Sequence, residues 1–290
     1  MSPLTSGAPV VLVFGLQDPT VRWTVNHLRE AGVGAVAVPA GMPSAAAASA
    51  VAAADACVHL LSAGQGVDGT FLEYWQLAAE SGRARYIAVY DLSPLSLDVN
   101  EAAAIATRVL EEDVLVTTLP LLDEGEAVIG VLDVVSGEQW FPDGEVQGPR
   151  EDFSQAVEAE SNTWLDEADA TGQSPMDALR DGLLAAAVTL DTRSRAGIDW
   201  LARHLPDRQM PPATTVLSSH GERAVVVAGP EGLVVGPAMA LVGTSASKVR
   251  VSALASLGEP GLIARLAPGA IAAADIEPPV AAGTLLIAGH

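Results

Sequence analysis

Short apolar runs alternate with helix-like stretches along the first part of the chain. The runs are residues 10–14, 33–39, 57–61, 86–90 and 114–119, and each has the length of a β-strand. The stretches between them have a helical spacing of apolar residues or are rich in alanine, and they are 20–31, 45–54, 70–80 and 100–110. Strands that alternate with helices are typical of a parallel sheet covered on both faces. The pattern therefore predicts an α/β domain with a doubly wound, mostly parallel sheet.

The regular alternation of predicted strands and helices is interrupted between residues 121 and 185. Two apolar segments, 127–135 and 138–141, lie close enough together to predict a β-hairpin. The acidic segment 151–169 predicts an amphipathic helix whose charged side faces solvent. Its apolar side carries Phe153, Val157 and Trp164. A dedicated protein-contact face is the alternative interpretation of this acidic segment.

The end of the first domain is predicted from two helices and a linker. Residues 174–188 and 197–205 are predicted to be helical. The prolines that follow indicate a linker, and they are Pro206, Pro211 and Pro212. We therefore expect the first domain to span residues 1–210, with an inserted subdomain at about 120–185.

After residue 213 the chain consists of short β-branched runs between Gly/Pro turns. The runs are 214–219, 223–228, 232–235, 238–243, 248–254, 261–266 and 283–288. Short strands at this spacing are typical of a small all-β barrel. The second predicted domain is therefore a barrel of residues 211–290.

Composition and charge narrow the functional classes. The chain has 290 residues, of which 49% are hydrophobic and 18% charged, as in a globular protein. Fifteen basic residues face 36 acidic ones, and the net charge of −21 opposes long-range attraction to DNA. No run is long enough to span a membrane and no signal peptide is evident, so we expect a cytoplasmic protein without a membrane partner. Cys57 is the single cysteine and Lys248 the single lysine.

Several segments, in this order, resemble elongation factor G. Residues 53–69 (AADACVHLLSAGQGVDG) resemble the strand and loop that follow switch II in that family of translational GTPases. Residues 119–135 (LPLLDEGEAVIGVLDVV) resemble the opening of its inserted subdomain, and residues 179–188 followed by 197–206 resemble the end of its GTPase domain. Residues 268–286 (PGAIAAADIEPPVAAGTLL) resemble the end of its domain II.

The resemblance implies a P-loop-GTPase-like domain followed by a barrel that resembles domain II. It covers nearly the whole chain, which ends where domain II of the family ends. Three later domains of the family therefore have no counterpart in this sequence.

The phosphate loop of the family is degenerate in this chain. Gly15 and Asp18 are the positions that survive, and the resemblance makes them vestigial phosphate-binding residues. Thr20 stands in place of the second glycine, and Val21 replaces the lysine that bridges the β- and γ-phosphates. Arg22 lies one position late, on another side of the helix, so its use as a substitute for the lysine is the less favoured interpretation.

The other nucleotide motifs are absent as well. No D-x-P-G-H string occurs, and the short interval between Gly15 and Asp55 implies that both switch regions are deleted. Residues 90–93 (YDLS) stand where N-K-x-D would read guanine, with Ser93 in place of the base-reading aspartate. Asp91 is two positions early and is interpreted as a turn or helix-cap residue before Pro94.

Other candidate chemistry is sparse. The five histidines have no metal-ligand spacing. His59, inside an apolar strand, is predicted to be a hydrogen-bonded core residue, and His220 a turn residue of the barrel. Cys57 is predicted to be a buried hydrophobic residue. Three carboxylates fall in the predicted hairpin loop, where a catalytic pair is the less favoured interpretation: Asp123, Glu124 and Glu126.

These observations predict a non-catalytic relative of elongation factor G that binds the ribosome or a translation-factor protein. No catalytic residue, metal or cofactor is expected, so the chain is not expected to be an enzyme. One alternative is a GTP-binding protein with an atypical site, which would use GTP and Mg²⁺. The other is an oligomerisation module that uses segment 151–169. The oligomeric state does not follow from the sequence.

Overall fold

The computed structural model describes most of the first predicted domain and the strands of the second. The described residues are 9–15, 18–38, 51, 54–67, 69–92, 98–110, 112–149, 153–206, 224–228, 233–242, 245–255, 262–266, 271–277 and 284–288. Several predictions lie outside them: the strand 214–219, the linker after Pro206, Ser93, His220 and nearly all of the helix at 45–54.

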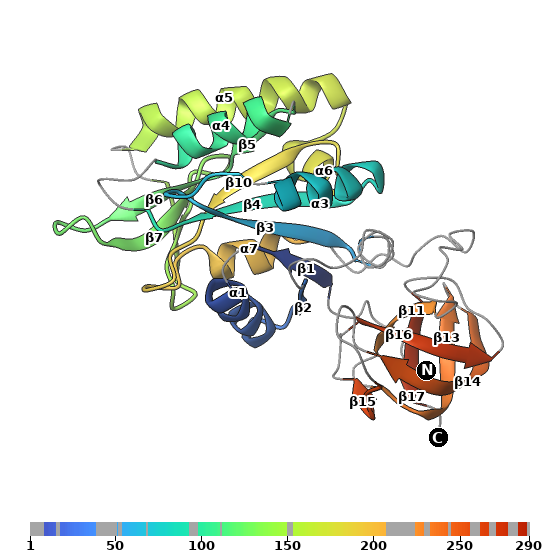
Figure 1. Cartoon of the computed structure of the whole chain (residues 1–290). Coiled ribbons are helices and arrows are strands. Elements are labelled where there is room, and N and C mark those ends of the chain that lie inside the picture. Colours follow the sequence, from blue (N-terminus) through green and yellow to red (C-terminus); the bar gives the residue numbers. More distant parts are fainter. Residues whose placement is uncertain are drawn as a thin grey trace.

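A six-stranded, all-parallel sheet forms the centre of the first domain (Figure 1). In spatial order its strands are β2 (Gly34–Ala37), β1 (Val10–Phe14), β3 (Ala56–Ser62), β4 (Ala84–Tyr90), β10 (Ala185–Thr189) and β5 (Val114–Val116). Every neighbouring pair is parallel. The expected mixed α/β fold with a parallel sheet is confirmed.

Helices cover both faces of this sheet, and they are α1 (Asp18–Glu30), α3 (Gly69–Glu80), α4 (Val99–Leu110), α5 (Ser154–Thr171), α6 (Pro175–Arg180) and α7 (Ile198–His204). Alternate residues of β4 point to opposite faces. Tyr86 packs in the cluster that contains residues of α1, α5, α6 and α7, whereas Ile87 packs in the cluster of α3 and α4. The sheet is therefore buried on both sides, which explains why its strands are continuously apolar.

Strand β10 corrects the prediction of a helix over residues 174–188. The helix α6 ends at Arg180, and residues 185–189 (AAAVT) lie between β4 and β5 in the sheet. Alanine has the highest helix propensity, so the local sequence favours a helix. Tertiary pairing decides otherwise, because all five residues are buried and hydrogen-bonding strands lie on both sides.

The predicted strand at 114–119 is in fact two strands. β5 ends at Val116, and β6 (Thr118–Leu122) turns away into a separate antiparallel sheet. That four-stranded sheet continues with β7 (Val128–Asp133), β8 (Gln139–Trp140) and β9 (Val146–Gln147). It contains the predicted hairpin, and helix α5, the predicted acidic helix, follows it. Trp164 of that helix is buried.

The second body is a closed five-stranded barrel with the order β11 (Ala224–Ala228), β16 (Ile271–Glu277), β14 (Ser245–Ala255), β13 (Gly236–Val242) and β17 (Thr284–Ala288). A two-stranded sheet of β12 (Leu233–Val234) and β15 (Arg265–Leu266) accompanies it. The alanine-rich β16 was not among the predicted strands. None of the described helices combines the length and the hydropathy that a transmembrane span requires.

His59 lies in the core of the sheet domain, but the prediction that it is hydrogen-bonded is wrong. Neither ring nitrogen has a hydrogen-bond partner among the described residues. The ring instead stacks on Phe14, with centroids 4.6 Å apart, and contacts Phe71 and Trp75. The imidazole therefore packs as an apolar ring. Burial, and secondarily the charge of Arg85, lowers its pKa from 6.5 to about 3.

Replacing His59 should make the protein less sensitive to acid. The folded pKa lies below the unfolded value, so the unfolded state binds more protons and stability falls as the pH drops from 6.5 towards 3. We expect His59→Leu to remove about 2 kcal/mol of this loss at pH 5. Urea unfolding of both proteins between pH 7 and 5 measures the difference. Parallel stability–pH curves for His59→Leu and wild type would contradict the burial of a neutral imidazole.

Candidate functional site

The strand order places a switch point at the carboxyl edge of the sheet between β1 and β3. From β1 the chain goes to β2 on one side and then returns to β3 on the other. Ligands of open α/β sheets bind outside the carboxyl ends of the strands at such a point. The sequence-predicted positions Gly15 and Asp18 lie here, since Gly15 follows β1 directly and Asp18 begins α1.

The space next to Gly15 is filled by apolar side chains. A Cβ atom at Gly15 would lie 2.9 Å from Cγ2 of Val21 and 3.1 Å from Cβ of Leu60. Both of these side chains are buried, and both belong to the apolar cluster on the α1 face of the sheet. Position 21 thus packs into the core next to Gly15, whereas a phosphate-loop lysine extends towards its ligand.

A set of hydroxyl groups occupies the adjoining edge between β3, β4 and α1. The Tyr90 phenol is hydrogen-bonded to the side chains of Ser62 and Thr20. Burial, and next the charge of Asp91, raises the pKa of Tyr90, and the two hydrogen bonds oppose that shift. The phenol therefore remains protonated at neutral pH and links the carboxyl ends of β3 and β4 to the first turn of α1.

Asp91 is held in an unusual backbone conformation directly after β4. Its φ is +60°, which a non-glycine residue rarely adopts. Ser62 Oγ donates to its carboxylate over 3.3 Å and itself accepts a hydrogen bond from the amide of Gly64. The carboxylate thus contacts the neighbouring strand, whereas the sequence predicted a role in its own turn. Asp91 also has a further interaction within the protein, so its carboxylate is not unpaired. We assign it no catalytic role.

Hydrogen bonds to β6, and within the loop that follows, hold the carboxyl end of β10 in place. Thr189 donates its amide to Thr118 Oγ1 over 2.7 Å and its hydroxyl to the Thr118 carbonyl over 3.0 Å. In the loop that follows, Asp191 Oδ2 accepts hydrogen bonds from the amide and hydroxyl of Ser194 at 2.6 and 2.8 Å. These contacts fix the connection into α7.

The chemistry of this edge is that of neutral hydroxyls and carboxylates. Hydroxyl groups donate and accept hydrogen bonds but bring no positive charge to a polyphosphate. Arg22 is the nearby cation; its helix position is exposed and it already has an interaction within the protein. Across the residues that the structure describes, no three His, Cys, Asp or Glu side chains gather as a metal centre would require.

Sequence reasoning located the edge but missed Tyr90 and Ser62, which occupy it. Both looked like ordinary strand residues, and only the parallel pairing of β3 with β4, which aligns Ser62 with Tyr90, reveals their proximity. Asp123, Glu124 and Glu126 lie in the loop of the β6–β7 hairpin, as predicted. Asp123 Oδ1 accepts the amides of Gly125 and Ala127 and thereby shapes the turn. Cys57 is buried as predicted, and burial raises the pKa of its thiol to about 12.

Comparisons with known proteins define the class of fold and go no further. No protein-family model matches the chain, and no curated protein matches its sequence. The crystal structure of a protein from Thermus thermophilus is similar, with a TM-score of 0.57 over 98% of this chain and 15% sequence identity. This chain spans 54% of the length of that protein. The likeness shows a shared fold, which is a mixed α/β domain with a six-stranded parallel sheet together with antiparallel β structure.

Proposed function

We propose that this chain is a pseudo-GTPase that resembles the first two domains of elongation factor G and that acts by binding the ribosome or a translation-factor protein. The observation that carries the proposal is the packing of Val21. At the position where a phosphate loop needs a cation, this side chain is buried against Gly15 and Leu60. A buried valine supplies none of the charged hydrogen bonds that each contribute roughly 1.5–3 kcal/mol.

The order of the elements supports the same proposal. A parallel α/β sheet with a four-stranded antiparallel insertion precedes a closed barrel, as the resemblance to the GTPase domain and domain II implies. The Tyr90 phenol is hydrogen-bonded to the side chains of Ser62 and Thr20 at the edge where a nucleotide would bind. These contacts support the proposal of a GTPase-like scaffold whose ligand edge holds the protein's own side chains.

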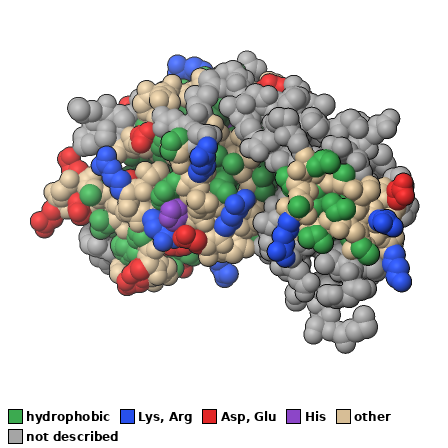
Figure 2. All heavy atoms as spheres, turned by 60° about the horizontal axis from the view of Figure 1, so that its bottom comes forward, with side chains coloured by type: hydrophobic (Ala, Val, Ile, Leu, Met, Phe, Trp, Pro, Cys, Tyr) green, Lys and Arg blue, Asp and Glu red, His purple; other side chains and the backbone are tan. Residues whose placement is uncertain are grey.

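The surface charge favours a protein partner at least as much as ribosomal RNA. Figure 2 shows Lys and Arg side chains among acidic and apolar ones on the face in view, and some of them lie next to one another. The net charge of −21 nevertheless disfavours binding driven by phosphate neutralisation alone. We therefore propose a cytoplasmic protein that recognises a protein surface of the ribosome or of a translation factor.

Two measurements on the full chain test the proposal. In sedimentation with purified ribosomes we expect the protein in the pellet at low salt and still at moderate salt. In titration calorimetry with GTP or GDP and Mg²⁺ we expect no binding at micromolar affinity. A protein that stays in the supernatant with ribosomes and does not co-purify with a translation factor would contradict the binding role.

Micromolar nucleotide binding would instead favour the alternative of a GTP-binding protein with an atypical site. Arg22→Ala would then show whether Arg22 supplies the missing cation. Arg108→Ala on α4 is the matched control, because both variants remove one arginine from the surface of a helix of the same domain.

A further inference from the structure

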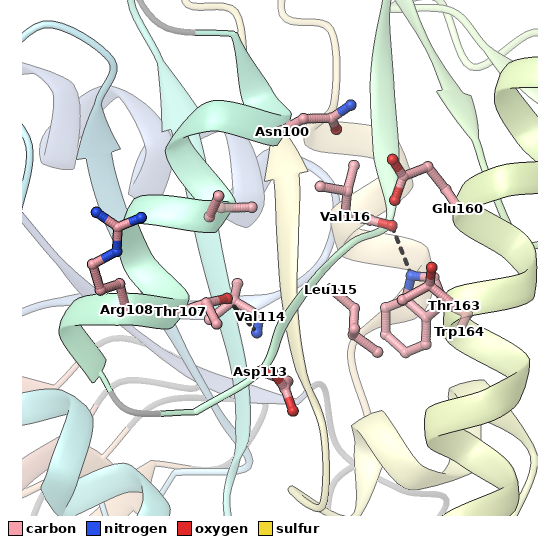
Figure 3. A pocket seen from close by; sticks show the side chains of 12 residues that line it. Asn100, Thr107, Arg108, Asp113, Val114, Leu115, Val116, Glu160, Thr163 and Trp164 are labelled. Atoms are coloured by element: carbon pink, nitrogen blue, oxygen red, sulfur yellow. Dashed lines mark hydrogen bonds between the residues drawn. The ribbon is translucent and has the colours of Figure 1, made fainter.

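A cavity of about 490 Å³ lies at the open edge of the parallel sheet, between α4 and α5 (Figure 3). Strand β5 forms its floor, and Trp164 of α5 and Ala103 of α4 form its apolar walls. This cavity is separate from the carboxyl edge described above, because β4 and β10 lie between β5 and β3 in the sheet.

The open edge of β5 exposes backbone groups to this cavity. The Thr117 amide donates to the Ala187 carbonyl over 2.9 Å, so Thr117 and, by alternation, Leu115 face β10. Val114 and Val116 therefore face the cavity. Two of their four backbone groups are already bonded: the Val114 amide donates to Thr107 Oγ1 over 3.0 Å, and the Val116 carbonyl accepts from Trp164 Nε1 over 2.7 Å.

The remaining pair of groups has the geometry of one rung of a parallel ladder. Within the described part of the chain, the Val114 carbonyl and the Val116 amide make no hydrogen bond. In a parallel sheet, a residue of the incoming strand donates to one such carbonyl and accepts from the amide two residues further on. Because Thr107 and Trp164 occupy the flanking groups, the edge accepts one residue of an extended chain.

The charge around the rung is negative. Figure 3 shows Glu160 of α5 and Asn100 of α4 reaching towards each other across the gap, and Asp113 and Arg108 also line the cavity, so its lining carries two carboxylates and one guanidinium. Glu160 is partly buried and has no ion-pair partner among the described residues. Exposed acidic residues of the same helix make the electrostatic potential near the cavity more negative, and they are Glu158, Asp166 and Asp169. Helix α5 contains no basic residue.

We propose that this cavity binds an extended basic segment of a partner protein. One residue of the segment pairs with the Val114 carbonyl and the Val116 amide, and a neighbouring Lys or Arg side chain meets Glu160 beside the apolar wall formed by Trp164. Strand addition supplies the backbone hydrogen bonds, and the carboxylate supplies the preference for a basic sequence. The proposal does not depend on the proposed ribosome-binding role, since it rests on the α4–β5–α5 edge alone.

The first test uses charge. A fluorescein-labelled peptide of four Lys-Val repeats is titrated with the full chain and followed by fluorescence anisotropy. We expect Glu160→Lys to weaken binding at least tenfold and Glu158→Lys less than threefold, although both change the net charge by the same amount. An equivalent peptide of Glu-Val repeats should not bind. Equal losses in the two variants, or no binding of the basic peptide to the wild type, would overturn the proposal.

The second test uses the backbone. Val116→Pro removes the amide that the rung needs, and a proline is tolerated there because this amide faces away from the β10 ladder. We expect at least a tenfold loss of peptide affinity. Hydrogen exchange on the wild type supplies a readout that needs no variant, because bound peptide should protect the Val116 amide. An unprotected Val116 amide in the saturated complex would refute strand addition at this edge.

Discussion

Gly197→Ala should destabilise the sheet domain by about 4 kcal/mol or more. Gly197 precedes α7 with φ +90°, a conformation that a residue with a Cβ adopts only under strain. A Cβ atom there would also overlap the carbonyl oxygen of Thr189, which belongs to β10. The backbone cannot move away easily, because Leu190 and Asp191 hold this connection through hydrogen bonds to Val89 and Ala196.

A matched control separates the overlap from the backbone strain. Gly32 has a similar φ of +86°, but nothing lies within 4 Å of the Cβ that Gly32→Ala would add. We expect that variant to lose only about 1 kcal/mol. Urea unfolding followed by tryptophan fluorescence makes the comparison, since all five tryptophans lie between residues 23 and 200 and none belongs to the barrel. Equal losses for the two variants would mean that the close approach to Thr189 does not exist in solution.

Asp133→Ala should cost about 3 kcal/mol, the second-largest expected effect. The Asp133 side chain is 4% exposed and accepts three hydrogen bonds. Its Oδ1 accepts the amides of Val135 and Ser136, and its Oδ2 accepts the indole N–H of Trp200 over 2.9 Å. The substitution leaves this buried indole N–H without an acceptor, and water cannot replace the carboxylate because Trp200 is fully buried.

The neighbouring histidine does not substitute for the lost carboxylate. His204 Nε2 lies 3.8 Å from Asp133 Oδ2, and its ring stacks on Trp200 with centroids 4.1 Å apart. Burial lowers the pKa of His204, although a backbone hydrogen bond to Trp200 and the charge of Asp133 oppose the shift. Nδ1 of the neutral ring donates to the Trp200 carbonyl over 2.8 Å, which leaves Nε2 as an acceptor, but the imidazole is stacked on the indole and does not lie in the plane into which the indole N–H points.

The exposed Asp123 is the matched control for Asp133. Its Oδ1 also accepts two backbone amides, those of Gly125 and Ala127, but in a hairpin turn open to solvent. We expect Asp123→Ala to cost less than about 1 kcal/mol, since water replaces the acceptor. The same fluorescence-detected unfolding applies. A loss from Asp133→Ala as small as that from Asp123→Ala would contradict the burial of the carboxylate network.

The pattern of apolar residues predicted β1, β3 and α1 well because burial leaves a local signature. β1 and β3 are short apolar runs of strand length, and α1 has apolar residues at helical spacing. Alanine-rich segments carry no such signature. Strands β10 and β16 were both missed, because alanine is small and favours helices, and only pairing with flanking strands determines their conformation.

For the candidate site too, some features follow from the sequence alone and others only from the tertiary structure. The replacement of the phosphate-loop lysine by Val21, and the absence of the other nucleotide motifs, follow from the sequence alone because those motifs are contiguous. The contacts of Tyr90 with Ser62 and Thr20, and the cavity beside β5, join residues far apart in the chain. Only the order and register of the strands bring such groups together, because hydrogen-bonded pairing, and not local propensity, decides which strand lies next to which.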